Sequence, residues 1–203
     1  LATPGPRVPL TRDASLWKRA VDLGTRLIWL QTFGERSQDP AAGRGGTMPE
    51  APGLALVQPV SELPEGTSSI RYTASSHTIE IGGGRVAGVL PEVWGFAVSG
   101  MPVVRKWLGY RCERRAGRGG RSNNPLDQIG VASWPEEWSR ELLDLLRVLT
   151  LTVAIREEQS DLLLQICAGP TLSAAELPVP VAAERTSAGV SCDPVDAPAL
   201  SSL

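Results

Sequence analysis

The sequence has few of the side chains from which most catalytic and metal-binding sites are built. It contains a single histidine, His77, and three cysteines, Cys112, Cys167 and Cys192, with no Cys-x-x-Cys spacing. A zinc site or a histidine-assisted nucleophile would need partners that these scattered residues do not supply. An odd number of unclustered cysteines also argues against a disulfide framework. We therefore expect no metal site and no disulfide, and a reducing, cytoplasmic location.

Long hydrophobic runs and nucleotide-binding glycine motifs are also missing. No segment approaches the roughly 20 apolar residues that cross a bilayer, and the proline-rich start lacks the pattern of a signal peptide. The glycines at 43–46 lack the Lys-Ser/Thr of a phosphate-binding loop, and those at 82–84 precede a strand instead of a helix. Asn124-Pro125 is followed by Leu126, unlike the Asn/Asp-Pro-Pro-aromatic tetrapeptide of a base-flipping methyltransferase. We expect no membrane contact, no bound cofactor and no catalytic centre in this chain.

Charge is nearly balanced over the whole chain but is concentrated in one segment. The formal net charge is -2 and the pI is about 5.6, which by themselves give no support for nucleic-acid binding. Residues 105–121 carry seven cations against the single acid Glu113, which leaves a local charge of +6. Such a concentration is typical of surfaces that neutralise phosphates. The alternative is a solvated basic loop that pairs with the acidic helix expected at 136–144.

Eight side chains in and just after this basic segment are candidate DNA contacts. Arginine can form two hydrogen bonds with a phosphate or with the O6 and N7 edge of guanine, and asparagine can do the same with adenine. We expect Lys106 and Arg111 to contact phosphates and the far end of the segment to contact bases. The candidates are Lys106, Arg111, Arg114, Arg115, Arg118, Arg121, Asn123 and Asn124.

Aromatic residues other than tryptophan are scarce, with two Tyr and two Phe against six Trp. Trp134 and Trp138 should share one helix face, which favours a buried anchor over a base-stacking platform. Tyr72 and Tyr110 each lie next to an arginine and are candidates for base stacking. A buried tyrosine with a bonded hydroxyl is at least as good an interpretation of either. His77 follows two serines, and we expect it to be an ordinary turn or surface residue.

Periodic apolar residues predict helices in the first half of the chain. Apolar residues, four leucines and Ala20, recur every three or four residues over 14–30, with Asp13 as the N-cap and Gly34 as a left-handed terminator. A short helix is expected to start at Pro102 and to end before Gly109.

The C-terminal half has a second apolar stripe. It runs from residue 135 to about 155, with Ser133 as the candidate N-cap and acidic residues at the positive end of the helix dipole. A break is expected near Arg156, followed by a short helix at 158–166. We therefore expect two packed C-terminal helices.

Short β-branched and aromatic runs separated by glycines lie between these helices and predict an antiparallel meander. Gly82-Gly83-Gly84 is the expected hairpin turn because glycine adopts positive φ without steric cost. The predicted strands are 70–73, 78–81, 85–89 and 93–98. The fold class is therefore α+β, a small antiparallel β meander with a flanking N-terminal helix and two packed C-terminal helices.

Two segments lack any apolar period. Residues 37–53 are predicted to form a long exposed or disordered loop, and residues 170–203 a disordered tail. We therefore expect one domain over residues 1–169. Because the chain does not begin with Met, we expect it to be part of a longer enzyme.

Short motifs occur in a characteristic order between residues 8 and 168. They are Val-Pro-Leu-Thr at 8–11, Leu-Gln-Thr-Phe-Gly-Glu-Arg at 30–36, Val-Leu-Pro-Glu-Val-Trp at 89–94, Val-Ser-Gly at 98–100, Lys-Trp-Leu-Gly-Tyr-Arg at 106–111, Pro-Leu-Asp-Gln-Ile at 125–129 and Trp-Pro-Glu-Glu-Trp at 134–138. In this order and spacing they resemble the C-terminal specificity region of type ISP restriction-modification enzymes. Those are single-chain proteins that combine nuclease, translocase, adenine methyltransferase and target-recognition parts.

The resemblance implies a bacterial DNA target-recognition domain. Such a domain would bind double-stranded DNA and position it for N6-adenine methylation and cleavage by domains outside this chain. It implies the methyltransferase domain of the parent chain as a partner. It also implies S-adenosylmethionine, ATP and Mg as cofactors of the parent enzyme, with none bound by this chain.

Two other classes of function remain open at this point. The chain could be a non-catalytic scaffold whose apolar helix at 134–155 docks on a larger parent enzyme, with the basic segment incidental. It could also be a hydrolase built on His77, although the sequence offers that residue no clear catalytic partners. Steep salt dependence of binding would favour DNA recognition over docking through leucines.

Overall fold

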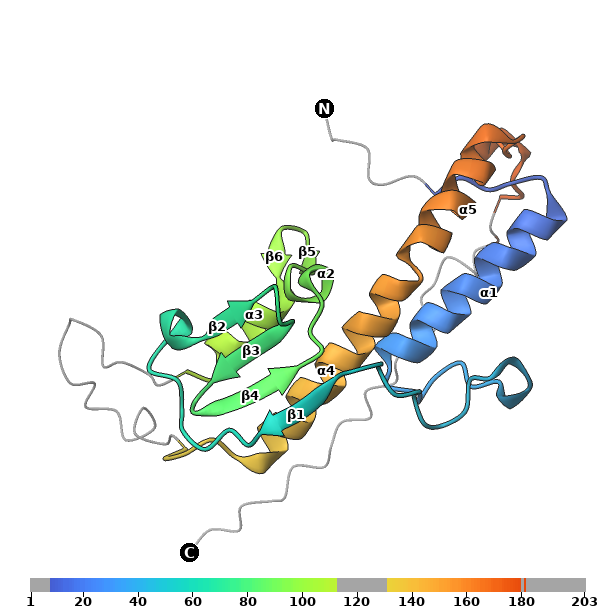
Figure 1. Ribbon diagram of the computed structural model, residues 1–203. Helices are drawn as coiled ribbons and strands as arrows, with labels where there is room; N and C mark the ends of the chain where they lie inside the picture. Colours follow the sequence, from blue (N-terminus) through green and yellow to red (C-terminus); the bar gives the residue numbers. More distant parts are fainter. Residues whose placement is uncertain (1–7, 113–130, 180, 182–203) are drawn as a thin grey trace, which may run out of the picture.

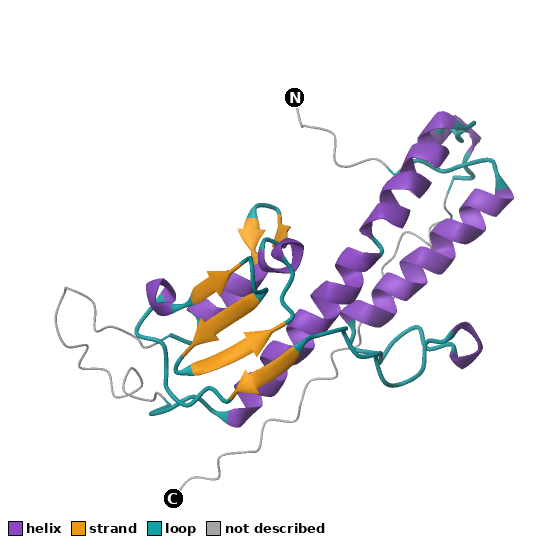
Figure 2. Ribbon diagram, in the orientation of Figure 1, coloured by secondary structure: helices purple, strands orange, loops and turns teal. Residues whose placement is uncertain are grey.

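The computed structural model describes residues 8–112, 131–179 and 181, and it confirms the α+β class. Figure 1 shows a small sheet on one side and long helices that extend away from it. Figure 2 separates the strands from the helices. The longer helices are α1 (Ala14–Gln31), α3 (Val103–Gly109), α4 (Glu136–Ala154) and α5 (Arg156–Ala168).

Four antiparallel strands form the main sheet in the order β1-β4-β3-β2. They are β1 (Ala55–Gln58), β2 (Arg71–Thr73), β3 (Thr78–Ile81) and β4 (Gly84–Ala87). Three of these strands match predicted ones, whereas β1 lies directly after the segment that was predicted to be a loop. β1 is short and its residues are mostly exposed, so its sequence carries little alternation of apolar and polar side chains.

The strand predicted at 93–98 is wrong. Residues Pro91–Trp94 form a one-turn helix, α2, and only Ala97–Val98 (β5) is extended, pairing with Met101–Pro102 (β6). Proline at the first helical position favours the turn, and it brings Val93 into the core, where this side chain is fully buried. Tertiary burial therefore overrides the β-branched character of the sequence here.

The glycine-rich hairpin is confirmed. Ile81 pairs with Gly84, so Gly82 and Gly83 are the two central residues of the turn, with φ of 50° and 75°. Positive φ at both central positions is the geometry of a type I′ turn, whose twist matches that of the flanking strands. The turn is held from outside as well, because the backbone N–H groups of Ser61 and Glu62 both donate to the carbonyl oxygen of Gly82.

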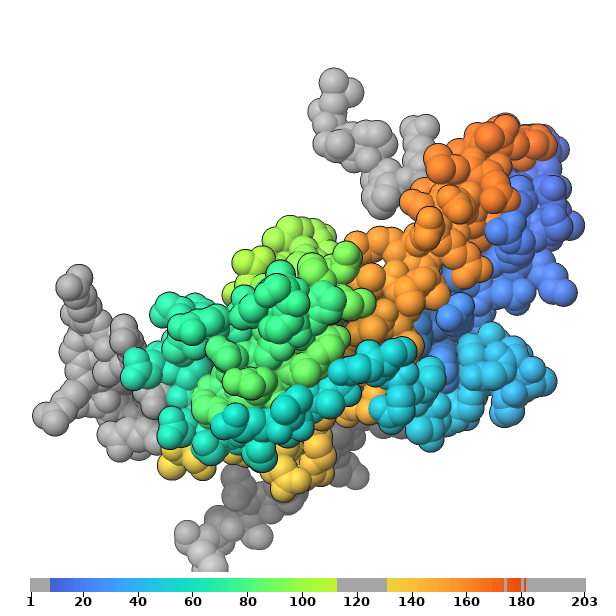
Figure 3. All heavy atoms as spheres, viewed as in Figure 1, coloured from blue at the N-terminus to red at the C-terminus, as the bar shows by residue number. Residues whose placement is uncertain are grey.

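One face of the sheet is covered by α4 together with α2 and α3. The inward row across the strands is Leu56, Val86, Ile79 and Tyr72, and it packs in one hydrophobic cluster with Leu142, Leu146 and Leu149 of α4. α3 contributes Val104 and Leu108 to the same cluster, and neither is exposed to solvent. The other face of the sheet is turned to the viewer in Figure 3 and carries no covering helix there.

A second cluster joins the long helices. α4 and α5 follow each other with a break at Ile155, and α1 lies beside both of them (Figure 1). The two predicted C-terminal helices are therefore present, and their common packing partner is α1. The buried members are Leu23, Trp29, Leu30, Met48, Val148, Ile155, Leu162 and Ile166.

The cap of α1 is confirmed and that of α4 is not. Oδ1 of Asp13 accepts hydrogen bonds from the Ser15 hydroxyl and from the backbone N–H groups of Leu16 and Ser15, and these bonds lower the pKa of the Asp13 carboxyl. For α4, Pro135 is the N-cap residue and no side chain caps the helix, so Ser133 does not have the predicted role. The acidic Glu136 and Glu137 do lie in its first turn, as predicted.

The segment at 37–53 is not the wholly exposed loop that its composition predicts. Met48 is 7% exposed and Ala51 is 4% exposed. The indole Nε1 of Trp29 donates to the carbonyl oxygen of Gly45 at 2.7 Å, and Arg147 of α4 pairs with Glu50 at 3.2 Å. A tip at Asp39–Arg44 closes on itself around the short 3-10 helix Pro40–Ala42. The segment is therefore attached to the long helices at several points.

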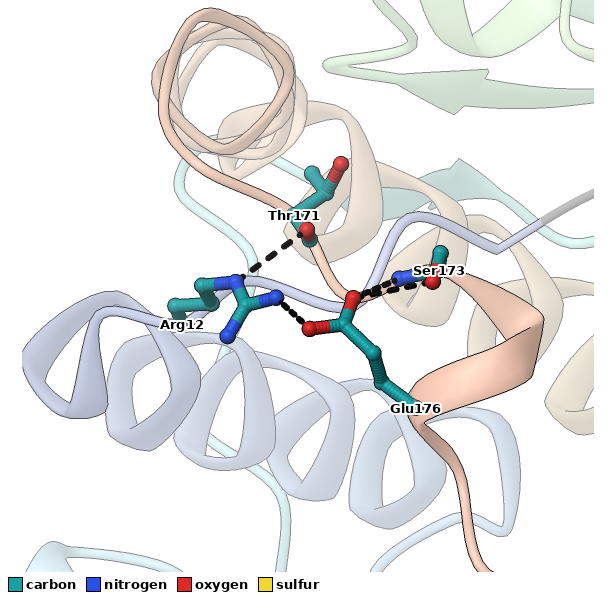
Figure 4. A network of polar contacts seen from close by, with 4 residues as sticks. All are labelled: Arg12, Thr171, Ser173 and Glu176. Atoms are coloured by element: carbon teal, nitrogen blue, oxygen red, sulfur yellow. Dashed lines mark hydrogen bonds and ion pairs between the residues drawn. The ribbon is translucent and has the colours of Figure 1, made fainter.

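The described start of the chain is joined to the residues that follow α5. Thr11 forms a β-bridge with Thr171, and the N–H of Leu172 donates to the oxygen of Leu10 at 2.8 Å. Figure 4 shows Arg12 directed at Glu176, with which it forms an ion pair. Hydrogen bonds from Ser173 and Arg12 lower the pKa of Glu176 to about 2. The first residues of the predicted tail are therefore attached to the domain, and residues 182–203 lie outside the described part.

Candidate nucleic-acid interface

The basic segment begins on α3 and continues beyond the described residues. Lys106 and Arg111 are described, and the other six candidate DNA contacts lie outside the described residues: Arg114, Arg115, Arg118, Arg121, Asn123 and Asn124. The structure thus describes the first part of the basic segment, residues 105–112. It also shows Val131, where the described chain resumes ahead of α4.

Lys106 lies on the exposed side of α3. Its neighbour Arg105 is also exposed, and the Lys106 ammonium lies 5.0 Å from the centre of the Tyr110 ring. Tyr110 is 74% exposed, so its ring face is accessible to a base or to another flat group. These three side chains form an accessible cationic and aromatic surface at the end of α3.

Tyr72, the other predicted stacking residue, belongs to the core. Its ring stacks on Trp94 with the centroids 5.0 Å apart, and its hydroxyl donates to the carbonyl oxygen of Val89 at 3.0 Å. Burial, with a smaller contribution from Glu92, raises the pKa of the Tyr72 hydroxyl. Of the two interpretations left open for this residue, the structure favours a tyrosine packed against the core with a bonded hydroxyl, although the ring is only partly buried.

Arg111 is engaged within the protein. Its guanidinium carbon lies 3.5 Å from the centre of the Trp107 ring and 5.3 Å from that of Trp138. Its Nη2 pairs with Oε2 of Glu141 at 2.6 Å, and its side chain is only 20% exposed. A planar guanidinium stacked on an indole and paired with a carboxylate is held in one position more firmly than an exposed lysine.

Three tryptophan rings lie together beside Arg111. Trp134 is 5% exposed, and its ring centre lies 5.3 Å from that of Trp138 and 6.3 Å from that of Trp107. Its Nε1 donates to the hydroxyl of Ser139 at 3.0 Å. Trp134 is buried and Trp138 is partly buried against the core, which fits an anchor, but Trp134 precedes α4, so the two rings do not share a helix face as predicted. Trp107, Arg111, Trp134, Trp138 and Glu141 are called the arginine–tryptophan cluster below.

The uncovered face of the sheet carries charges that the sequence analysis did not single out. The row Gln58, Arg85, Glu80 and Arg71 crosses the four strands in register. Glu80 lies 3.5 Å from Arg85 and 3.9 Å from Arg71, and all three side chains are at least 42% exposed. The sequence could have indicated this charged row, because its two arginines lie on two predicted strands at positions that alternate with the inward-facing residues. Two arginines against one glutamate give this face a positive balance.

The candidate catalytic and metal-binding residues lie apart. His77 is exposed in the turn between β2 and β3 with φ of 51°, in line with the predicted turn position. Cys112 and Cys167 are free thiols, and burial raises the pKa of Cys112. Within residues 8–112 and 131–179, no group of His, Cys, Asp and Glu could hold a metal ion. No helix in these ranges is long and apolar enough to cross a membrane.

An α+β domain that presents exposed cations beside an exposed aromatic ring is suited to binding a polyanion. The family model of the type ISP C-terminal specificity domain matches residues 1–145, so the chain belongs to this family. The match covers α1, the sheet, α3 and the first half of α4. No curated protein and no solved structure matches the chain.

Family membership establishes the general role. The chain is a target-recognition domain of the restriction-modification type, and its partner is DNA. The motif resemblance noted in the sequence is confirmed by this match, since residues 1–145 include every one of the motifs from Val8 to Trp138.

Proposed function

We propose that this chain reads a DNA sequence and positions the duplex for N6-adenine methylation and cleavage by other domains of a type ISP enzyme. The observation that carries the proposal is the exposed surface of Arg105, Lys106 and Tyr110 on α3. In a domain of the specificity family, this surface leads directly into the arginine-rich remainder of the basic segment. The parent would be a cytoplasmic, site-specific adenine methyltransferase with endonuclease activity.

The chemistry would be supplied outside this chain. S-adenosylmethionine, ATP and Mg²⁺ would bind to other domains of the parent, and the methyltransferase domain would be the immediate neighbour. The role of this chain's residues is to bind and orient the duplex. Phosphate contacts fix the register of the protein on the duplex, and base contacts choose the sequence.

The alternative function, docking on a parent enzyme through the helix at 134–155, would need an exposed apolar surface that this helix does not have. Leu142, Leu146 and Leu149 of α4 pack on the sheet, and Val148 and Leu151 pack with α1 and α5, so the apolar side of this helix is already covered. The described surface better suited to the parent's methyltransferase domain is the outer side of α1. Trp17, Val21 and Ile28 lie on one helical stripe there, and each is about half exposed.

The salt dependence of DNA binding tests the proposal. Lys106→Ala should weaken binding to target and scrambled duplexes alike and should lower the slope of log affinity against log salt by about 0.9, as the loss of one phosphate contact does. Asn123→Ala or Arg121→Ala should instead relax the preference at a single base pair at a cost of about 1–3 kcal/mol. The measurement is a binding titration over a series of KCl concentrations.

The matched control is Lys18→Ala, which removes a cation from the exposed surface of α1. It should leave both affinity and slope close to those of the unchanged protein. If alanine at all eight candidate positions alters neither affinity nor slope, the basic segment is a solvated surface and the proposal is wrong.

A further inference from the structure

The arginine–tryptophan cluster joins two parts of the chain that are separated by residues 113–130. Trp107 lies in the last turn of α3 and Arg111 two residues after that helix, whereas Trp138 and Glu141 lie in the first turns of α4 and Trp134 just before it. The Trp134 ring contacts both Trp107 and Trp138, with ring centres 6.3 Å and 5.3 Å away. The end of α3 and the start of α4 are thus held together by one continuous set of contacts.

The guanidinium of Arg111 is at the centre of this set. Its Nη2 pairs with Glu141 at 2.6 Å, its Nη1 donates to the carbonyl oxygen of Trp107, and its face lies on the Trp107 ring. Its Nε is buried, and no described residue accepts a hydrogen bond from it. The guanidinium is therefore engaged by Glu141 and Trp107 and is only 20% exposed, whereas Lys106 forms no ion pair among the described residues.

We propose that Arg111 is a positioning residue for DNA recognition and not a phosphate contact. With Glu141 it fixes where the chain leaves α3 and where it returns ahead of α4. The end of α3 carries the exposed cations Arg105 and Lys106, and a cationic surface that is already held in one position loses less conformational freedom when it binds DNA. The inference rests on the proposed function, namely that the basic segment contacts DNA.

The variant Glu141→Gln separates the two roles by the sign of its effect. If Arg111 contacted a phosphate, loss of the competing carboxylate would free the arginine and strengthen DNA binding. If Arg111 acts through its pair with Glu141, the same change weakens binding. We expect about a fivefold or larger loss of affinity for a labelled random-sequence duplex, with the salt slope unchanged.

A matched control removes the general effect of deleting an acid. Glu137→Gln lies on the same helix, one turn earlier, and its carboxylate pairs only with Arg140 among the described residues. Because DNA is a polyanion, Glu137→Gln should leave affinity equal or slightly higher. An affinity of Glu141→Gln that equals or exceeds that of Glu137→Gln overturns the inference. Unchanged far-ultraviolet circular dichroism in the full chain shows that both variants are folded.

Arg111→Lys and Arg111→Ala complete the experiment. Lysine keeps the charge but lacks the flat, forked group, so a positioning role predicts that it fails to restore affinity, while a phosphate contact predicts near-normal binding. Arg111→Ala should weaken binding without changing the salt slope, and adding Glu141→Gln to it should cause no further loss. A slope reduced by about 0.9 in Arg111→Ala would show a direct phosphate contact and overturn the inference.

Lys106→Ala in the same series keeps failure of this inference distinct from failure of the proposed function. If Lys106→Ala lowers the salt slope while Glu141→Gln behaves as Glu137→Gln does, only the positioning role of Arg111 is wrong. If the unchanged protein does not bind duplex DNA, the proposed function falls and this inference falls with it.

Discussion

At the scale of single residues, the surroundings of each arginine of this domain determine whether its side chain is available for binding. Arg111 is stacked and paired in the arginine–tryptophan cluster, while Arg140 is an exposed partner of Glu136 and Glu137. Arg147 is 24% exposed and joins Asp144 on its own helix to Glu50 in the segment at 37–53. Exposed ion pairs such as those of Arg140 add little to stability. A partly buried and stacked pair, such as that of Arg111 with Glu141, holds its side chains in one position. Local charge counts therefore overstate the number of arginines available to DNA.

Neighbouring leucines of α4 should differ in their effect on stability. Leu146 is fully buried between the sheet and the helices, whereas Leu145 is only partly buried at the edge of the same cluster. Leu146→Ala should lower the free energy of unfolding by about 2–5 kcal/mol, because it leaves a cavity in a closed site. Leu145→Ala should lower it by less than about 2 kcal/mol, since solvent and neighbours can fill the space. Urea denaturation of both variants measures the difference, and equal losses would contradict this view of α4.

At the scale of secondary-structure elements, the β3–β4 hairpin organises the sheet. Its two-residue turn sets the register of β3 against β4, and this register places Ile79 and Val86 opposite each other on the inward face. The same register places Glu80 opposite Arg85 on the uncovered face. A slip by one residue would exchange the two faces, so the turn specifies which side chains enter the core.

The two glycines of that turn should respond differently to substitution. A side chain on Gly82, with φ of 50°, would collide with the carbonyl oxygen of Glu62. At Gly83, with φ of 75°, the nearest atom to an added Cβ is Oγ of Ser61 at 3.5 Å. Gly82→Ala should therefore destabilise the domain by at least about 1–3 kcal/mol, and Gly83→Asn should change stability by less than about 1 kcal/mol, because asparagine tolerates this conformation. Thermal denaturation tests the pair, and a tolerated Gly82→Ala would refute the close approach of Glu62.

At the scale of the whole molecule, α4 is shared by two hydrophobic clusters. Leu142, Leu146 and Leu149 pack on the sheet, while Val148 and Ile155 pack on α1 and α5. Helix α4 therefore connects the sheet to the long helices α1 and α5. The bridge between Thr11 and Thr171 then closes the far end of the helices.

The two ends of the tail should differ in importance. Ending the chain after residue 181 should leave the melting temperature unchanged, because residues 182–203 have no apolar period that could offset the entropy of ordering them. Ending it after residue 169 removes the backbone hydrogen bonds between Arg12 and Pro170 and between Leu172 and Leu10. This should cost about 1–2 kcal/mol of stability. Calorimetry of the two truncated proteins measures the difference, and identical melting temperatures would show that the bridge contributes nothing.

Features that depend on neighbours along the chain could be predicted before the fold was known. The spacing of leucines predicted α1 and α4, Asp13 predicted a helix start, and the glycines at 82–84 predicted the hairpin, because caps, helical faces and tight turns involve residues a few positions apart. The concentration of positive charge and the order of motifs likewise pointed to DNA recognition before any fold was known.

Tertiary structure alone decided which distant groups meet. Val93 is helical because it enters the core, and the segment at 37–53 is attached because Trp29 and Arg147 reach it from other helices. Arg111 is held by Glu141, thirty residues further along the chain, which no local pattern indicates. The physical reason is that burial and ion pairing depend on positions in space, and these are set only after all the elements have packed together.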